Sequence, residues 1–484
     1  MLTLANIFEA ITGQKTTLGA QQPVTDVVID SRLVIPGCLF IALQGERTHG
    51  HAYVAEAFAR GAIAAIVEDD LVLDCQRVDL RGGLEPAPAS LELPLCLRVE
   101  SSLEALQKLA AFWRRLHSPR VIGITGSVGK TTTKELTAAV LARRYKTLRS
   151  RGSYNNEIGL PLTLLQLTPA HERVVLEMGM YDVGEIAALA EIALPHVGVV
   201  TNVGPVHLER AGSLERIAQA KAELVEALPP APEGVAILNY DDPRVLAMAE
   251  RTEARVLTYG LSPQADLWAS DIVSMGLEGV RFQLHYQGET LHLRVPLLGR
   301  HSVHTALRAA AVGLVEGESW QEIVEGLQRG APQLRLVAVP GLRGSTILDD
   351  TYNASPASTI AALNLLAELE GRKIAVLGDM LELGSYEVEG HRKVGRRAMD
   401  VADLLITVGR LGRLIGEEAL RCGMPGDRVY ILESNEAATA LLRERLQPGD
   451  VVLVKGSRAM RMEEIVNALV VPVWEAETPT AAAG

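Results

Sequence analysis

Apolar residues along this chain follow two kinds of pattern. In some segments they form short continuous runs bounded by turn residues, which is typical of buried strands. In others they recur every three or four positions, which is typical of amphipathic helices. Continuous runs at 121–125, 174–177 and 197–201 alternate with helical stretches. This order predicts a doubly wound domain built on a parallel sheet.

The same alternation of strands and helices occurs on either side of that region. Between 280 and 295, strict alternation of apolar and polar residues around a Gln-Gly turn predicts a β-hairpin insertion. We therefore expect an α/β protein of three domains: a small N-terminal α/β domain at 1–98, a central doubly wound domain with the hairpin at 99–329, and a C-terminal Rossmann-like domain at 330–484.

Length and composition fit three separate cores and exclude several classes of protein. The 484 residues include 47 basic and 59 acidic ones, which gives a net charge of -12, and the acidic groups are spread along the chain. A general nucleic-acid or anionic-membrane binder needs a basic face, so neither is expected. Without a run of about eighteen apolar residues or a signal-type start, we expect a cytoplasmic protein with no membrane insertion. The four cysteines lack CxxC spacing, which argues against a disulfide framework or a zinc knuckle.

The strand at 121–125 leads into a glycine-rich loop and then a helical pattern. The residues are Gly126, Ser127, Val128, Gly129, Lys130, Thr131 and Thr132. Glycines let backbone N–H groups approach phosphate oxygens, Lys130 can reach the β- and γ-phosphates, and the Thr131 hydroxyl can bind Mg²⁺. Ile124 replaces the first glycine of the strict motif, so a plain turn with a surface lysine is the alternative. The order of strand, loop, GKT and helix favours ATP binding.

Polar residues elsewhere in the central region are candidates for the same site. Glu177 ends the run at 174–177, at the sheet edge where ligands collect, and it can bind magnesium or face solvent. His207 follows the next strand, and a lone histidine is more often structural. Lys221 lies in a helical stretch, where the local pattern favours a solvated lysine.

Two strands of the third region also end in polar groups. One runs into Asp350 and the other into Lys455. Each could be an ordinary strand-ending turn. Because two such ends occur in one domain, we expect this domain to close over a ligand held by the central domain.

Together these motifs resemble the Mur ligase family along nearly the whole chain. The likeness rests on Asp30-Ser31-Arg32, Gly123 to Thr132, Asn155-Asn156-Glu157-Ile158-Gly159, Glu177-Met178-Gly179, Thr201-Asn202-Val203-Gly204, His207, Lys221, Asp349 to Asn353, Leu377 to Gly384 and Lys455-Gly456-Ser457-Arg458. Within the family, the segments at 155–159 and 377–384 favour the branch that adds D-alanyl-D-alanine over the branch that adds the third peptide residue.

The resemblance implies an ATP-dependent ligase that forms an amide bond in peptidoglycan precursor synthesis. By similarity, the carboxylate of UDP-N-acetylmuramoyl-tripeptide attacks the γ-phosphate of ATP. D-alanyl-D-alanine then displaces phosphate from the acyl phosphate. The family also implies that the N-terminal domain binds the UDP-sugar and the central domain binds ATP, and we expect a monomer.

The same resemblance implies roles for individual residues. The implied catalytic residues are Lys130, Lys221 and His207. Two Mg²⁺ ions are implied, one held by Thr131 and Glu177 and the other by His207 and a carbamylated Lys221. Nucleotide contacts beyond the loop are implied for Arg335, near the γ-phosphate, and for Asp350, at the ribose. Substrate contacts are implied for Ser31, Asn155, Asn156 and Lys455.

The chain departs from the family pattern at two places. Where the family usually has His-Asn-x-x-Asn near adenine, this chain has His301-Ser302-Val303-His304-Thr305, so both asparagines are missing. Thr48-His49-Gly50-His51 lacks the aspartate that is common before the glycine.

Two alternative functions stay open. One is another carboxylate–amine ligase, such as a folylpolyglutamate synthase type, and the other is a nucleotide-operated binding protein without ligase activity.

Overall fold

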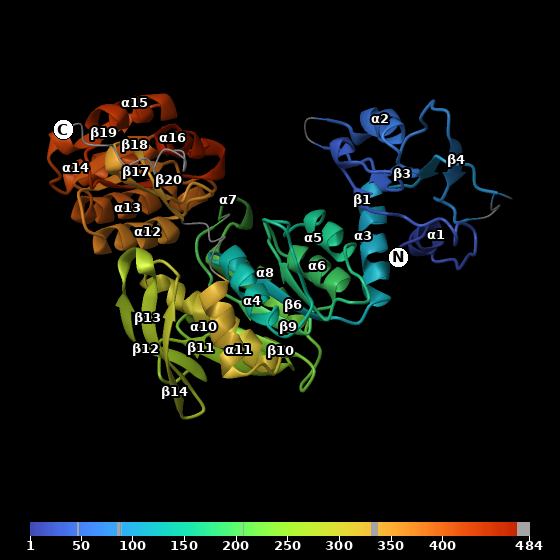
Figure 1. Ribbon diagram of the computed structural model, residues 1–484, viewed down its shortest axis with the longest axis horizontal. Coiled ribbons are helices and arrows are strands. Elements are labelled where there is room, and N and C mark those ends of the chain that lie inside the picture. The colour runs from blue at the N-terminus through green and yellow to red at the C-terminus, as the bar shows by residue number, and fades with distance from the viewer. Residues whose placement is uncertain (46–47, 85–87, 89, 207, 331–336, 472–484) are drawn as a thin grey trace, which may run out of the picture.

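The computed structural model describes residues 1–45, 48–84, 88, 90–206, 208–330 and 337–471. Its strands form three sheets, and Figure 1 shows the N-terminal and C-terminal domains on opposite sides of the central one. The predicted α/β architecture of three domains is confirmed. The boundaries at 98/99 and 329/330 stay predictions.

The N-terminal domain is built on a parallel sheet of five strands in the order β1-β2-β3-β5-β4. The strands are β1 (Val27–Val28), β2 (Leu39–Ile41), β3 (Ala64–Val67), β4 (Gln76–Asp79) and β5 (Leu95–Arg98). Neighbouring residues of a strand point to opposite faces. Phe40 therefore packs with α2 (Val54–Ala59), while Leu39 packs with α1 (Leu4–Thr12) and α3 (Ser102–Arg115). Because α3 also contacts the central domain, it joins the two domains.

The central domain contains a sheet of nine strands in the order β14-β13-β12-β11-β10-β9-β6-β8-β7. The strands are β6 (Arg120–Thr125), β7 (Thr147–Arg149), β8 (Arg173–Glu177), β9 (Val197–Val200), β10 (Val235–Asn239), β11 (Arg255–Gly260), β12 (Leu267–Ser274), β13 (Val280–Tyr286) and β14 (Glu289–Val295). Strands β6 to β12 pair in parallel, and β12, β13 and β14 pair antiparallel. The predicted hairpin is present and extends the edge of this sheet.

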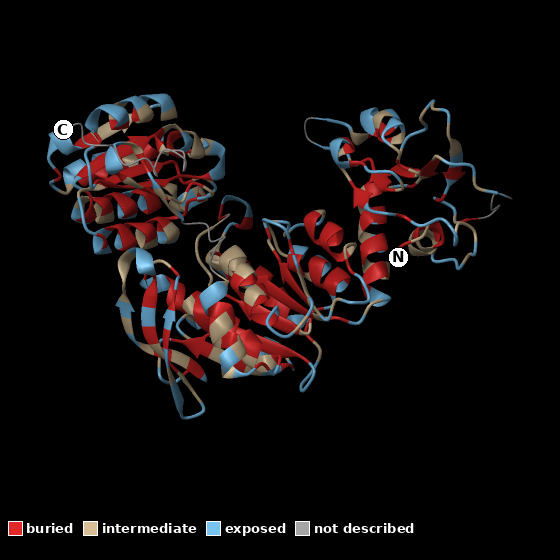
Figure 2. Cartoon of the chain, viewed as in Figure 1, coloured by how far each residue is buried: buried red, intermediate tan, exposed pale blue. Residues whose placement is uncertain are grey.

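Helices cover both faces of the central sheet. They are α4 (Lys130–Leu141), α5 (Gly159–Leu164), α6 (Glu185–Ala193), α7 (Leu208–Ala211), α8 (Leu214–Glu226), α9 (Pro243–Leu246), α10 (Val303–Val315) and α11 (Trp320–Arg329). One face packs against α4, α10 and α11, and part of the other packs against α3, α5, α6 and α8. Figure 2 shows the buried strands between these helices.

The C-terminal domain is a three-layer sandwich around a sheet of six strands in the order β15-β16-β20-β17-β18-β19. The strands are β15 (Val337–Pro340), β16 (Thr346–Asp349), β17 (Lys373–Gly378), β18 (Leu404–Val408), β19 (Val429–Leu432) and β20 (Val451–Lys455). One face carries α12 (Pro356–Glu368), α13 (Glu387–Val401) and α14 (Gly412–Arg421), and the other carries α15 (Asn435–Arg445) and α16 (Glu463–Leu469). Only β15 is antiparallel to its neighbour among the pairs described. Across the described residues, every helix is too short or too polar to cross a bilayer.

Candidate active site

A large cavity lies between the central and C-terminal domains. Its volume is about 1950 Å³. From the central domain it is lined by Ser127, Val128, Gly129, Lys130, Thr131 and Thr132, and from the C-terminal domain by Asp350, Tyr352 and Lys455. Carboxyl ends of parallel strands meet at one edge of a sheet, and here two such edges face the same space.

The loop predicted to bind phosphate, called the phosphate-binding loop from here on, consists of residues 126–129 and joins β6 to α4. Gly126 has φ of +141°, and a Cβ added there would lie 1.8 Å from Thr201 Oγ1, so the position requires glycine. The Val128 N–H donates to Asn202 Oδ1 at 2.9 Å, and Thr201 Oγ1 donates to Val128 O at 2.8 Å. Residues that follow β9 therefore hold the loop in place. The Lys130 Nζ donates across the loop to Gly126 O at 2.7 Å.

Glu177 is the buried carboxylate beside this loop. It ends β8 and is 1% exposed. Its Oε2 accepts a hydrogen bond from Thr131 Oγ1 at 2.7 Å, and its Oε1 accepts one from Asn155 Nδ2 at 2.8 Å. A hydroxyl and a carboxylate are oxygen ligands of the kind that Mg²⁺ prefers, so the donor set at Thr131 and Glu177 fits that ion.

Lys221 is buried, with 2% of its surface exposed. The interpretation of Lys221 as a solvated lysine is therefore wrong. The residue lies on the inner side of α8 between Ala220 and Ala222, which are both buried. Burial lowers the pKa of the Lys221 amine well below its usual value, and the charge of Lys130 lowers it further.

Asp350 and Lys455 line the cavity on the side of the C-terminal domain. The Lys455 Nζ lies 2.6 Å from Asp350 Oδ2 and donates to Asn353 O at 2.8 Å. Lys455 has 2% of its side chain exposed and Asp350 has 14%. A buried ammonium group needs such partners, and this pair joins the polar ends of β16 and β20.

A side-chain hydrogen bond connects the two domains directly. The hydroxyl of Tyr352, in the C-terminal domain, donates to the Ser153 hydroxyl in the loop that follows β7. Both residues line the cavity. On the central domain's side, His304 Nε2 lies 2.8 Å from Asp241 Oδ2, and His304 also lines the cavity.

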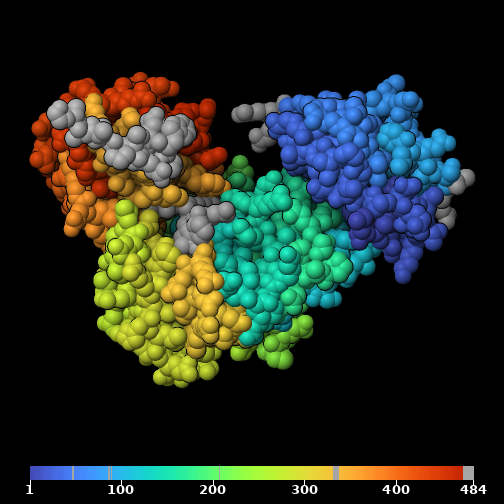
Figure 3. All heavy atoms as spheres, viewed as in Figure 1, coloured from blue at the N-terminus to red at the C-terminus, as the bar shows by residue number. Residues whose placement is uncertain are grey.

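The remaining predicted residues include one in the N-terminal domain, one more in the cavity and two outside the described residues. Ser31 is in the N-terminal domain, where its hydroxyl donates to Glu56 Oε2 at 3.1 Å. Figure 3 shows open space between that domain, in blue, and the C-terminal domain, in orange and red. Asn156 lines the cavity, and its Oδ1 accepts a hydrogen bond from the Gly159 N–H at 2.9 Å. His207 and Arg335 lie outside the described residues.

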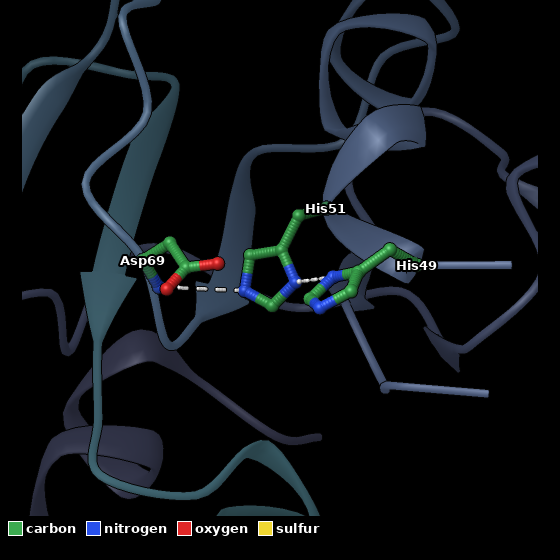
Figure 4. A group of neighbouring side chains, drawn as sticks. All are labelled: His49, His51 and Asp69. Carbon is green, nitrogen blue, oxygen red and sulfur yellow. Dashed lines mark hydrogen bonds between the residues drawn. The ribbon is translucent and has the colours of Figure 1, made fainter. Parts of the chain in front are cut away.

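The segment Thr48–His51, which departs from the family pattern, contributes two histidines to a compact group in the N-terminal domain. His49, His51 and Asp69 offer ligand atoms within 4.8 Å of one another (Figure 4). However, His51 Nε2 accepts the Glu68 N–H at 2.8 Å, so in the neutral ring the proton sits on Nδ1, 2.9 Å from His49 Nδ1. Both ring nitrogens of His51 are thus engaged within the protein, and the group is explained by its own hydrogen bonds.

Sequence reasoning missed some residues and contacts of the site. Asn155 was predicted to contact the substrate, and the structure adds a hydrogen bond from its amide to Glu177. Asn202, quoted only as part of a motif, holds the phosphate-binding loop. Arg308 also lines the cavity. The signal for Arg308 was present, because it is the single Lys, Arg, Asp or Glu residue in the mostly apolar stretch 303–315.

Comparisons with known proteins agree with this architecture. The chain matches, in order, the Mur ligase family catalytic domain at residues 23–114, the Mur ligase middle domain at 124–313 and the Mur ligase glutamate ligase domain at 334–458. It is 39% identical over 499 residues to the UDP-N-acetylmuramoyl-tripeptide–D-alanyl-D-alanine ligase of Mycobacterium tuberculosis, covering 97% of this chain and 98% of that protein.

Solved structures give the same result. MurF from Acinetobacter baumannii superposes with a TM-score of 0.82 at 30% identity, covering 96% of this chain and 97% of that one. The MurF ligase of Thermotoga maritima in complex with ADP superposes with a TM-score of 0.77 at 29% identity, covering 92% of this chain and 96% of that one. Over nearly its whole length, therefore, this chain belongs to the Mur ligase family.

Proposed function

We propose that this protein joins D-alanyl-D-alanine to UDP-N-acetylmuramoyl-tripeptide, coupled to the cleavage of ATP to ADP and phosphate, in peptidoglycan precursor synthesis. One observation carries the proposal. The phosphate-binding loop with Thr131 and Glu177, and the Asp350–Lys455 pair, line a single cavity between two domains. The relatives named for this reaction match the chain end to end, which supports the same substrates here.

The chemistry follows from the poor reactivity of a carboxylate toward amines. The terminal carboxylate of the tripeptide attacks the γ-phosphorus of ATP, the bond to the β-phosphate breaks, and ADP leaves. The D-alanyl-D-alanine amine then attacks the acyl carbon of the acyl phosphate. The tetrahedral intermediate collapses with loss of inorganic phosphate, and the amine releases its proton.

Residues of the phosphate-binding loop bind and orient the nucleotide. Backbone N–H groups at the start of α4 face the phosphates, and Lys130 moves from the Gly126 carbonyl to the β- and γ-phosphate oxygens. Thr131 and Glu177 would hold a Mg²⁺ ion, which would supply positive charge beside the phosphates. Closing the C-terminal domain over this loop excludes water from the acyl phosphate.

A second Mg²⁺ is proposed at His207 and Lys221. A buried lysine cannot ligate a cation as an ammonium group, but its neutral amine can react with CO₂ to form a carbamate, whose oxygens are anionic ligands. The burial of Lys221 beside the charge of Lys130 favours the neutral amine. Arg335 at the γ-phosphate and Asp350 at the ribose complete the proposed nucleotide contacts.

The UDP-sugar end of the substrate is assigned to the N-terminal domain, with Ser31 as a contact. Asn155, Asn156 and Lys455 are proposed to contact the peptide within the cavity. We also propose that the enzyme is a monomer and acts in the cytoplasm. Gel filtration with light scattering tests the oligomeric state.

A substrate-dependence assay tests the proposal. We expect phosphate release from ATP only when UDP-N-acetylmuramoyl-tripeptide and D-alanyl-D-alanine are both present, with the pentapeptide product seen by mass spectrometry. Turnover with folate and glutamate instead would assign the chain to the folylpolyglutamate type. ADP formation that is indifferent to both substrates, or ATP binding without any amide product, would contradict the proposal.

A further inference from the structure

Arg308 is a buried cation inside the proposed nucleotide cavity. It lies on α10, is 4% exposed and lines the cavity. Its Nη2 donates to Thr305 Oγ1 at 2.8 Å, one turn earlier on the helix, and its buried Nε has no hydrogen-bond partner in the described part of the chain. Burial of a charged group beside neutral partners is unfavourable unless an anion also binds there.

The guanidinium lies against the phosphate-binding loop. A Cβ added to Gly129 would lie 3.2 Å from Arg308 Nη2 and 3.7 Å from its Cζ. Gly129 is the N-cap of α4, so the cation faces the positive end of that helix dipole. Lys130, the first residue of α4, adds a further positive charge. In the free protein these charges repel one another, and an anion between them would relieve the repulsion.

Among the described residues, no carboxylate forms an ion pair with Arg308, whose side-chain contacts are with Thr305 and Tyr259. The other neighbour of the guanidinium is Tyr259, whose ring centroid lies 5.8 Å from Arg308 Cζ and whose hydroxyl oxygen also interacts with the guanidinium. A purely structural role for Arg308 would rest on these contacts with Tyr259.

We propose that Arg308 is a second phosphate-binding cation of this site, contacting an oxygen of the triphosphate alongside Lys130, with Thr305 orienting the guanidinium. This inference rests on the proposed function to the extent that the loop binds ATP. It deepens that function because it assigns a phosphate contact to a helix outside the loop. The ligand recognised is the polyphosphate chain of a nucleotide and not its base.

Isothermal titration of the full chain with Mg·ATP and with Mg·tripolyphosphate tests the inference. We expect Arg308→Met to weaken both ligands by at least about tenfold, the loss typical of a charge-assisted contact. Arg308→Lys should recover part of the affinity, since it keeps the charge. Thr305→Val should weaken both ligands less than Arg308→Met does, because the cation stays in place.

Thermal unfolding separates a ligand contact from a structural role. Without ligand, Arg308→Met should melt at or above the wild-type temperature, while the rise in melting temperature caused by ATP should shrink. Arg114 is the matched control. It is also 4% exposed, but its Nε and Nη1 donate to the carbonyls of Ala193 and His117. Arg114→Met should therefore lower the melting temperature and leave the affinity for ATP unchanged.

The outcomes distinguish this inference from the proposed function. If the wild type binds ATP and forms product, but Arg308→Met binds both polyphosphates as tightly, only the Arg308 inference is overturned. A lower melting temperature with unchanged affinity would likewise assign Arg308 to the Tyr259 contact. If the wild type binds neither ATP nor tripolyphosphate, both proposals are wrong.

Discussion

Glu318 gives a quantitative test of how the central domain is packed. This carboxylate lies in the turn between α10 and α11 and is 5% exposed, and both of its oxygens are buried without a hydrogen-bond partner among the residues described. Burial raises the pKa of Glu318 from 4.5 to about 7, and the nearby charge of Glu322 adds to the rise. The folded protein thus keeps a proton on Glu318 at pH values where the unfolded chain has lost it.

The sign of the effect follows from proton linkage. Between pH 4.5 and about 7 the folded state binds more protons than the unfolded state, so the free energy of unfolding falls as pH rises. The pKa difference of about 2.5, at about 1.4 kcal/mol for each unit, gives a loss of about 3 kcal/mol that is complete above pH 8. Glu318→Gln keeps the shape of the side chain and stays neutral, so it removes this loss.

Urea unfolding at pH 5 and pH 8.5 measures the effect. At pH 5, where the unfolded carboxyl is already partly ionised, we expect Glu318→Gln to be more stable than wild type by less than about 1 kcal/mol. At pH 8.5 we expect the variant to be more stable by up to about 3 kcal/mol, which is several degrees in melting temperature. A stability difference that is the same at both pH values would refute the reasoning.

Glu322, at the start of α11, supplies a control of opposite sign. Hydrogen bonds from Ser319 and Arg144 lower the pKa of Glu322 to about 2. Its ionised form therefore stabilises the fold above the unfolded pKa near 4.5, and that stabilisation is lost as pH falls toward 2. Glu322→Gln should lower stability at pH 8.5, where Glu318→Gln raises it.

Three further predictions concern the cavity. Lys130→Ala should reduce substrate-dependent phosphate release by about a hundredfold or more while circular dichroism stays unchanged, because it removes the loop's cation. Lys455→Met should lower the free energy of unfolding by about 3 kcal/mol in urea titration, since it removes the buried ammonium partner of Asp350, and adding Asp350→Asn should restore part of that loss. Tyr352→Phe removes the hydrogen bond to Ser153, which is worth about 1 kcal/mol. It should raise KM up to about fivefold with little change in melting temperature. An unchanged KM would contradict a role of this hydrogen bond in domain closure.

The main strands of the fold were predictable because each carries a local signal. Continuous apolar runs gave β6, β8 and β9, and strict alternation gave the hairpin of β13 and β14. The phosphate-binding loop was recognisable because its chemistry requires glycine, lysine and threonine in a fixed order. The sequence did not show that the hairpin continues the central sheet, since strand pairing depends on distant contacts.

The sequence could not show which side of an element faces its neighbours, either for the predicted residues Lys221 and Asn155 or for Arg308, which was missed. Lys221 has polar residues near it in sequence, but its position on α8 turns it into the core. Asn155 reaches Glu177 across 22 residues, which no local spacing predicts. Arg308 interrupts an apolar stretch, yet only the packing of α10 beside α4 brings it to the phosphate-binding loop.

The most direct test of the central claim follows an oxygen atom from substrate to phosphate. The claim is that the tripeptide carboxylate is phosphorylated in this cavity before the amide bond forms. With both oxygens of the terminal carboxylate labelled with ¹⁸O, the account predicts that each turnover transfers one labelled oxygen to the released inorganic phosphate. Released phosphate without the label, at a rate matching product formation, would contradict it.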